Sequence, residues 1–248
     1  MLNFKKLMRP TKSVENVYQY MKPSIPADHC AQSRATDIVE AYLANKLFNP
    51  KTILDLGCGI GDTISYFEKK IPASTWTGID IESSPEVNAR TRSGDQFLTF
   101  DGVNIPVASK SIDLIYSNQV LEHVRHPEQL LANVSRVLSK KGYFIGQTSQ
   151  LEPYHSFSFW NFTFFGFKKI CEDAGLVLEE IRPSIDGPTL IDRSYKGRPK
   201  EMSRWFGEES PVNQEIEAKA LTEKQKIQII NFRKLQFCGQ FAFACRRK

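Results

Sequence analysis

The residues with the clearest chemical meaning are three alternating glycines, Gly57, Gly59 and Gly61, directly after an apolar segment that contains Asp55. Glycine adopts backbone angles closed to other residues, and its missing side chain lets a ligand approach the main chain. A strand, a glycine turn and a helix in this order form the nucleotide pocket of open α/β sheets. An acid inside the strand suits a cationic ligand that carries an amino group.

The spacing of these glycines distinguishes between kinds of nucleotide. A dinucleotide fingerprint, Gly-x-Gly-x-x-Gly, needs its third glycine one residue later, where this chain has Asp62. A carboxylate at that position would oppose a pyrophosphate. The turn therefore disfavours a NAD-dependent dehydrogenase.

A second acid, Asp80, ends the next apolar segment and is followed by Ile81. It lies about 20 residues after the glycine turn, the spacing at which an acid holds ribose hydroxyls in such sheets. Each carboxylate oxygen can accept a hydroxyl hydrogen bond. We expect Asp80 and Ile81 to contact the ribose side of a bound nucleotide.

Four histidines, His29, His123, His126 and His155, are candidates for a general base. Histidine is the side chain whose ordinary pKa suits proton transfer near neutral pH. His155 stands out because it lies in an unusually aromatic segment, residues 152–163, after a predicted strand. Ligands of open α/β sheets bind beyond the carboxyl ends of the strands, so His155 is the first candidate for the base. His123 is the second, with a structural role as its simpler interpretation.

Alternating strands and helices must position these residues, and they predict an α/β fold. We expect strands at 53–56, 75–80, 96–100, 111–118, 142–148, 176–185 and 236–245. We expect helices at 33–48, 62–67, 127–138, 163–174, 208–220 and 222–234. The polar stretch 187–207 reads as an ordered loop or a mobile lid.

The Asp-x-Gly-x-Gly-x-Gly pattern of residues 55–61 resembles motif I of the class I S-adenosylmethionine (SAM) methyltransferases. The segment Leu121-Glu122-His123 is similar to one that follows strand four in that family, and the resemblance covers about residues 51–176. It implies a Rossmann-like, mostly parallel seven-stranded sheet with helices on both faces, in which the last strand runs antiparallel between strands five and six. SAM is the implied cofactor.

The same resemblance implies further cofactor contacts. The position of Asp101 and Gly102, after the third strand, hydrogen-bonds the adenine amino group in the family. Asn118 and Gln119, after the fourth strand, are expected beside the cofactor. The sequence provides no cluster of carboxylates and histidines at ligand spacing, because the adjacent Glu122 and His123 would point apart on a helix. We therefore expect no metal.

The acceptor is expected between residues 154–163 and residues 186–204. Aromatic side chains stack on sugar rings, and the segment from His155 to Leu176 is similar to a methyltransferase branch of polysaccharide and glycan biosynthesis. Phe164 and Phe165 depart from that branch's usual sequence. The favoured function is O-methylation of a hydroxyl on a sugar or glycoconjugate precursor. A small-molecule O- or N-methyltransferase of secondary metabolism or quinone type is one alternative, and a catalytically inactive binding protein with this fold is the other.

Composition sets the remaining expectations. The 248 residues are 41% hydrophobic and 25% charged, with a net charge of +5 and scattered cations, which does not suggest a nucleic-acid partner. Five widely spaced cysteines indicate neither disulfides nor a zinc site. The sequence has no membrane-length apolar run, so we expect a cytoplasmic protein of open oligomeric state. We expect a single domain, with a helical cap at 1–50, a SAM-binding core at 51–187, an insertion at 188–235 and the last strand at 236–248.

Overall fold

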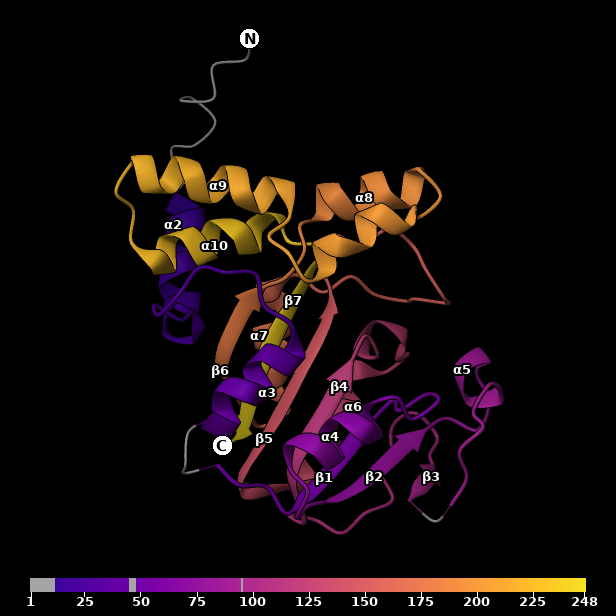
Figure 1. Cartoon of the computed structure of the whole chain (residues 1–248). Coiled ribbons are helices and arrows are strands. Elements are labelled where there is room, and N and C mark those ends of the chain that lie inside the picture. The colour runs from indigo at the N-terminus through magenta and orange to yellow at the C-terminus, as the bar shows by residue number, and fades with distance from the viewer. Residues whose placement is uncertain (1–11, 45–47, 95) are drawn as a thin grey trace.

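A computed structural model describes residues 12–44, 48–94 and 96–248, which form one sheet covered by helices (Figure 1). The sheet has seven strands in the order β3-β2-β1-β4-β5-β7-β6. The strands are β1 (Thr52–Leu56), β2 (Thr75–Asp80), β3 (Phe97–Thr99), β4 (Ile112–Asn118), β5 (Leu138–Ser149), β6 (Leu176–Pro183) and β7 (Gln240–Arg247). Strands β1 to β5 are parallel, and β7 runs antiparallel between β5 and β6. The predicted fold class is confirmed.

Most of the described helices lie between the strands, near the positions that the sequence predicts. The α-helices are α2 (Lys12–Met21), α3 (Ala35–Ala44), α4 (Thr63–Lys70), α5 (Pro85–Asn88), α6 (Pro127–Val137), α7 (Phe164–Asp173), α8 (Gly187–Tyr195), α9 (Pro211–Thr222) and α10 (Ile227–Phe237). The 3-10 helices are η1 (Lys22–Ser24), η2 (Leu121–His123) and η3 (Lys200–Phe206). Residues 1–11 of the expected cap and 45–47 of the expected helix at 33–48 lie outside the described residues.

Helices α2 and α5 were not predicted, α10 begins five residues later than expected and β5 begins four residues earlier. Two further segments differ from their predictions. Residues 187–207, expected as a loop or lid, form α8 and η3, because Asp186 caps α8 by accepting a hydrogen bond from the Thr189 amide at 2.7 Å. A proline in the first turn of α8 adds a second start signal. The last strand begins at Gln240 and not at residue 236, since α10 continues to Phe237.

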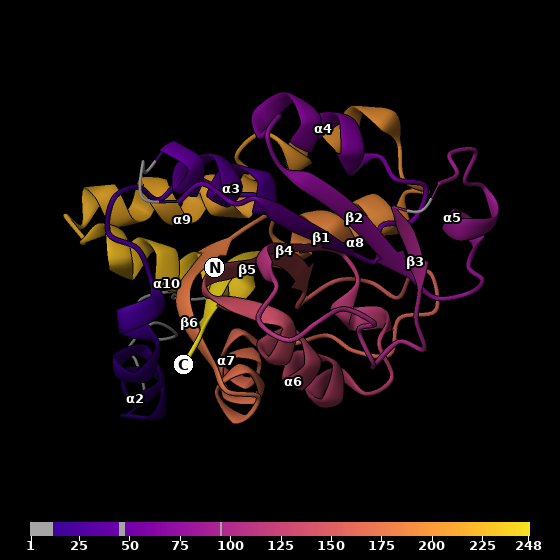
Figure 2. The same ribbon diagram turned by 90° about the horizontal axis from the view of Figure 1, so that it is seen from below.

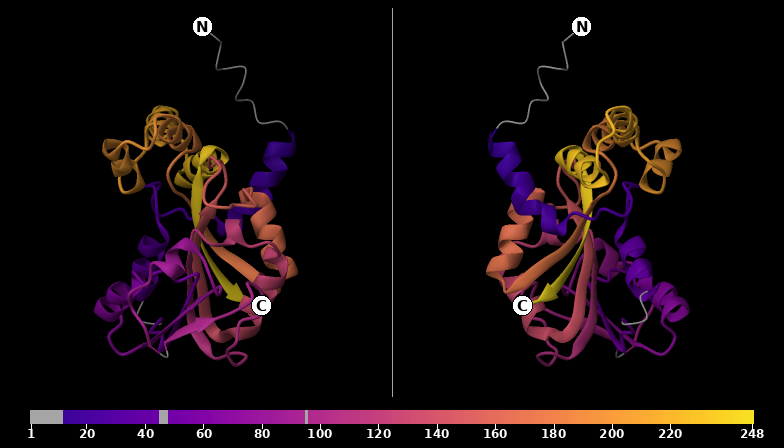
Figure 3. Two further views of the ribbon diagram at one scale, coloured as in Figure 1. Left: turned by 90° about the vertical axis from the view of Figure 1, so that its right-hand side faces the viewer. Right: turned by 90° about the vertical axis from the view of Figure 1, so that its left-hand side faces the viewer.

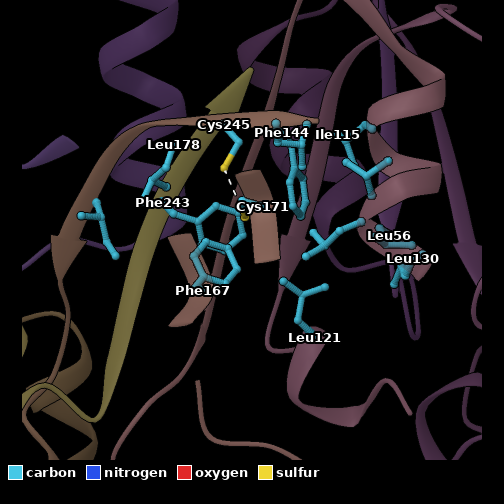
Figure 4. Packing of buried hydrophobic residues seen from close by; sticks show 14 of the residues in the cluster. Leu56, Ile115, Leu121, Leu130, Phe144, Phe167, Cys171, Leu178, Phe243 and Cys245 are labelled. Carbon is cyan, nitrogen blue, oxygen red and sulfur yellow. Dashed lines mark hydrogen bonds between the residues drawn. The ribbon is translucent and has the colours of Figure 1, made fainter. Parts of the chain in front are cut away.

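The sheet separates two layers of apolar packing, with α3 and α4 on one face and α6 and α7 on the other (Figure 2). Side chains of β7 alternate between the layers: Phe241 and Phe243 face α7, and Ala242 and Ala244 lie beneath α3. Figure 4 shows the α7 side, where Phe167 packs against Phe243 with ring centroids 4.5 Å apart. Alternation on both faces is the pattern of a strand buried on both sides.

Helices α8, α9 and α10 gather at one end of the sheet, the end at which β5 finishes (Figures 1 and 3). The C-terminus of β7 lies at the opposite end (Figure 1). The connections after β1, β2, β4 and β5 therefore share one edge with α8, and this edge carries the candidate site. Within the described ranges, no helix is both long enough and apolar enough to cross a membrane.

Candidate functional site

The glycine turn joins β1 to α4 and folds against the end of β2. The Gly57 amide donates to the Ile79 carbonyl at 2.8 Å, and the Gly61 amide donates to the Cys58 carbonyl at 2.8 Å. All three motif glycines have positive φ angles, 75° at Gly57, 49° at Gly59 and 84° at Gly61. A Cβ atom at Gly57 would lie 2.3 Å from a methyl group of Val120, so this position also requires glycine for space.

Asp55 lies beneath this turn and is only 2% exposed. Its carboxylate accepts a hydrogen bond from the Thr63 hydroxyl, which in turn accepts one from the Trp76 indole at 3.2 Å. Burial raises the pKa of Asp55 to about 7. The turn thus contains a carboxyl group that a nearby cation would ionise.

Asp80, at the end of β2, is tied to the glycine turn by its side chain. One carboxylate oxygen accepts from the Gly59 amide at 2.7 Å and the other from the Ile81 amide at 2.8 Å. Each oxygen keeps a further lone pair for a hydroxyl donor. The Ile81 side chain is 42% exposed, so it provides apolar surface beside the carboxylate.

Asp101 and Gly102 follow β3, but the Asp101 side chain serves its own turn. Its oxygens accept from the amides of Val103 (2.9 Å) and Asn104 (2.6 Å) and from the Asn104 side chain (2.6 Å). These bonds lower the pKa of this exposed carboxyl. A bond from Asp101 to an adenine amino group stays a prediction, and it would have to share these oxygens. Gly102 has a φ of 86°.

Asn118 and Gln119 lie at the end of β4, where the chain turns sharply. Asn118 is exposed, and Gln119 has a φ of 56° while its amide donates to the Gln147 carbonyl at 2.9 Å. In the orientation that satisfies its neighbours, the Gln119 carboxamide donates to Glu122 at 2.9 Å and Glu152 at 3.1 Å. The side chain of Gln119 therefore belongs to an acidic cluster, and its predicted cofactor contact stays a prediction.

Glu122 is the centre of that cluster and was not predicted as a site residue. It is fully buried, and its carboxylate accepts from the hydroxyls of Thr148 at 2.8 Å and Ser149 at 3.1 Å. The Ser149 hydroxyl also lies 2.6 Å from Glu152. Burial raises the pKa of Glu122 to about 7. The sequence gives no direct signal of this, since Thr148 and Ser149 reach Glu122 only through the pairing of β4 with β5.

The two candidate histidines meet beside Glu122. The rings of His123 and His155 are edge to face, with centroids 5.2 Å apart. Burial, and then the neighbouring His155, lower the pKa of His123. Its Nδ1 is buried and has no hydrogen-bond partner among the described residues. His155 Nδ1 lies 3.1 Å from the Pro153 carbonyl oxygen and 3.9 Å from Glu152 Oε1.

The sequence argument that Glu122 and His123 point apart is wrong. Both side chains leave the short helix η2 and converge with His155, and one ligand-type atom from each lies within 4.8 Å of the others. Two histidines and a carboxylate are a donor set that metals accept. The Glu122 carboxylate accepts from the Thr148 hydroxyl and shares the single proton of the Ser149 hydroxyl with Glu152, which equally suits a proton-transfer network. Metal independence stays a prediction.

A pocket of about 130 Å³ opens next to His155. It lies between the segment after β5 and helix α8, the two regions in which the acceptor was expected. Its polar lining includes two arginines, Arg193 and Arg198, that were not predicted as site residues. The complete lining is Glu152, Pro153, His155, Ser156, Leu190, Arg193, Ser194 and Arg198.

Comparison with known proteins decides the family. The profile of a methyltransferase domain family matches residues 27–181, more than half of the chain. This chain belongs to that methyltransferase family. A trans-aconitate 2-methyltransferase from Escherichia coli O1:K1 / APEC is 31% identical over 131 residues, which are 51% of each chain. The chain thus spans about half the length of the curated relatives it matches.

Solved structures support the methyltransferase fold. A SAM-dependent methyltransferase from Mesorhizobium loti superposes with a TM-score of 0.53 and 16% identity, over 86% of this chain and 98% of that one. A 1,6-didemethyltoxoflavin-N1-methyltransferase from Burkholderia thailandensis was solved with bound 1,6-didemethyltoxoflavin and S-adenosylhomocysteine. It superposes with a TM-score of 0.53 and 16% sequence identity, over 86% of this chain and 78% of that one. At these identities the likeness concerns the fold alone. The match to a methyltransferase family, whose fold these SAM-dependent enzymes share, supports SAM as the cofactor that the sequence predicted.

The residues of the glycine turn fit this methyltransferase cofactor. Gly57, Gly59 and Gly61 leave the backbone accessible, and Asp80 has lone pairs directed from the end of β2. The buried Asp55 supplies negative charge near the turn for a cationic amino acid group. The positions of these residues in a ligand complex stay predictions, as do the catalytic roles of His155 and His123.

Proposed function

We propose that this protein transfers a methyl group from SAM to an oxygen of a small acceptor, and that a hydroxyl of a sugar or glycoconjugate precursor is the favoured target. The observation that carries the proposal is the pocket beside His155, at the edge of the sheet that also holds the glycine turn. The proposal treats the chain as one cytoplasmic methyltransferase domain, with a cap at 1–50 and an insertion before the last strand. It includes no nucleic-acid partner.

SAM supplies an activated methyl group on a positive sulfonium, so the protein's main task is alignment. Proximity of this kind can lower a barrier by about 7–11 kcal/mol in favourable cases. In the proposal, Asp80 and Ile81 hold the ribose side, and Asp55 attracts the amino acid end. The acceptor then enters from the pocket of His155.

A hydroxyl acceptor must lose its proton, and His155 is the proposed base. The Pro153 carbonyl can only accept a hydrogen bond, so the neutral His155 ring carries its proton on Nδ1 and keeps a lone pair on Nε2. Glu152 Oε1, 3.9 Å from Nδ1, would stabilise the imidazolium formed after proton transfer. His123 packs edge to face against the His155 ring and would limit the rotation of that ring.

The sugar assignment rests on exposed aromatic rings next to the pocket. Tyr154 is 75% exposed, Phe157 74% and Phe159 58%, which is unusual for side chains of this size. Trp160 is 45% exposed, although its indole nitrogen is fixed by a 2.9 Å bond to the Val124 carbonyl. A ring held in place and partly open to solvent suits stacking against a sugar face.

A second candidate is methylation of a carboxylate. The two arginines of the pocket favour it, and the relatives that match half of the chain are named trans-aconitate 2-methyltransferases. A carboxylate at neutral pH is already deprotonated and needs no base. The two functions therefore differ in their dependence on His155.

The test is transfer of labelled methyl groups from SAM to three acceptor sets: neutral sugars, sugar phosphates and polycarboxylates. We expect a sugar-type acceptor to be labelled, and His155→Gln to lower its turnover by about 10²–10⁴-fold with little change in cofactor affinity. His126→Gln, an exposed histidine on the same edge, is the matched control. Labelling of a polycarboxylate that survives His155→Gln would favour the second candidate. Cofactor binding without transfer to any acceptor would favour the inactive binding protein.

A further inference from the structure

The polar lining of the pocket carries more positive than negative charge. Arg193 and Arg198 face it from the helical side, and Glu152 faces it from the segment after β5. Glu152 is already bonded there, since one of its oxygens accepts from Ser149 at 2.6 Å and from the Gln240 side chain at 2.9 Å. The arginines are therefore the less satisfied charges of the pocket.

Arg193, on α8, has a donor without a protein partner. Its Nε is buried and makes no hydrogen bond within the part of the chain that the structure describes. The rest of the guanidinium is held loosely, by a 3.4 Å bond from Nη2 to the Ser203 hydroxyl and by the Phe206 ring 5.2 Å away. A buried donor on a cation is costly to leave unpaired, so the Arg193 guanidinium is not fully satisfied by the protein groups around it.

Arg198 is positioned by the turn that ends α8. Its φ is 60°, and its amide donates to the Arg193 carbonyl at 2.9 Å. Gly197, with a φ of 78°, makes this turn possible. The turn returns the chain toward α8, so both arginines line the same pocket, one from α8 and one from the turn that follows it. The hydroxyls of Ser156 and Ser194 complete the set of donors around it.

We infer that this arginine pocket binds an anionic oxygen group of the acceptor, a carboxylate or a phosphate, while the acceptor's reactive oxygen lies toward His155. Guanidinium groups match both anions because they donate two parallel hydrogen bonds. The inference rests on the proposed function and narrows its acceptor: neutral sugars are excluded, whereas sugar phosphates and polycarboxylates fit.

The test measures binding directly, by calorimetry of the full chain with three probes. Citrate represents the carboxylate source, glucose 1-phosphate the phosphate source, and methyl α-glucopyranoside the uncharged control. We expect one anionic probe to bind and the glucoside not to bind. Arg193→Gln and Arg198→Gln should each lower the affinity for that probe by about 10- to 100-fold, the effect of losing one hydrogen bond to a charged group.

Lys196→Gln is the matched control, since Lys196 is an exposed cation at the end of the same helix, paired with Asp192 at 2.8 Å. It should leave probe affinity unchanged. The inference would be overturned if Lys196→Gln lowered the probe affinity as much as the arginine variants do. It would also be overturned if an Arg193→Gln/Arg198→Gln double variant kept the full probe affinity. S-adenosylhomocysteine affinity is measured in parallel and should stay constant in all of them. If the unaltered protein did not bind S-adenosylhomocysteine at all, the proposed function would be refuted, while the measured binding of the anionic probe would remain valid.

Discussion

Replacing Asp80 by alanine tests the cofactor assignment most directly. The carboxylate would lose two bonds to ribose hydroxyls, each about 1.5–3 kcal/mol for a charged acceptor. Water would recover part of this, so we expect a net loss of about 2–4 kcal/mol, a weakening of S-adenosylhomocysteine binding on the order of 30- to 1,000-fold. The measurement is isothermal titration calorimetry with S-adenosylhomocysteine, which cannot react.

The structure also predicts a second effect that must be separated from the first. Asp80 accepts the Gly59 amide at 2.7 Å, so its removal leaves this donor of the glycine turn unpaired. We expect the free energy of unfolding to fall by about 1–3 kcal/mol. Asp80→Asn, which keeps a carbonyl oxygen of the same size, should lose less on both counts, and Glu68→Gln, on the exposed side of α4, serves as the control. A folded Asp80→Ala protein that binds S-adenosylhomocysteine within threefold of the unaltered chain would refute the ribose assignment.

Three further predictions concern the same edge of the sheet. Burial raises the pKa of Asp55 to about 7, and a cationic cofactor binds the ionised carboxylate. SAM affinity should therefore rise between pH 6 and 8, by up to about tenfold per pH unit below the pKa. In Asp55→Asn, SAM affinity should depend much less on pH. Gly57→Ala should lower the free energy of unfolding by about 2–4 kcal/mol in chemical denaturation, from overpacking and a positive φ, and adding Val120→Ala should restore only the packing part. Methyl transfer should survive EDTA treatment; a loss that a divalent metal reverses would assign the Glu122 cluster to metal binding.

Local sequence patterns were sufficient to predict the glycine turn and the acid that lies beside it. Glycine spacing and the acid about 20 residues later depend on neighbours close in the chain, and the structure joins Asp80 to Gly59 by a direct bond. The antiparallel last strand was also predicted, although only through the family resemblance. What the residues alone predicted was alternation of strands and helices, which establishes the class of fold and leaves the strand order open.

The acceptor side was only partly predictable. His155, which lines the pocket, was singled out because an aromatic segment after a strand is visible in the sequence. Arg193 and Arg198 were not predicted as site residues, because residues 187–207 were expected to form a loop or a lid. The helix-start signal there is Asp186 at the N-cap with a proline two residues later. The environment of Glu122 could not be predicted from the local sequence, because it depends on the hydroxyls of Thr148 and Ser149, which β5 brings near it.

The position of β7 has a consequence for how the protein is made. Strand β6 bonds to the sheet only through β7, which comes some sixty residues later in the sequence. During synthesis β1 to β5 can pair in order, but β6 and α8, which carries Arg193, must wait for residues 240–247 to insert. The glycine turn and strands β1 to β5 can therefore form before the pocket between the segment after β5 and α8 is complete. A nascent chain stalled before residue 240 would leave the backbone groups along the edges of β5 and β6 unpaired, and such edges are prone to aggregation that chaperones prevent.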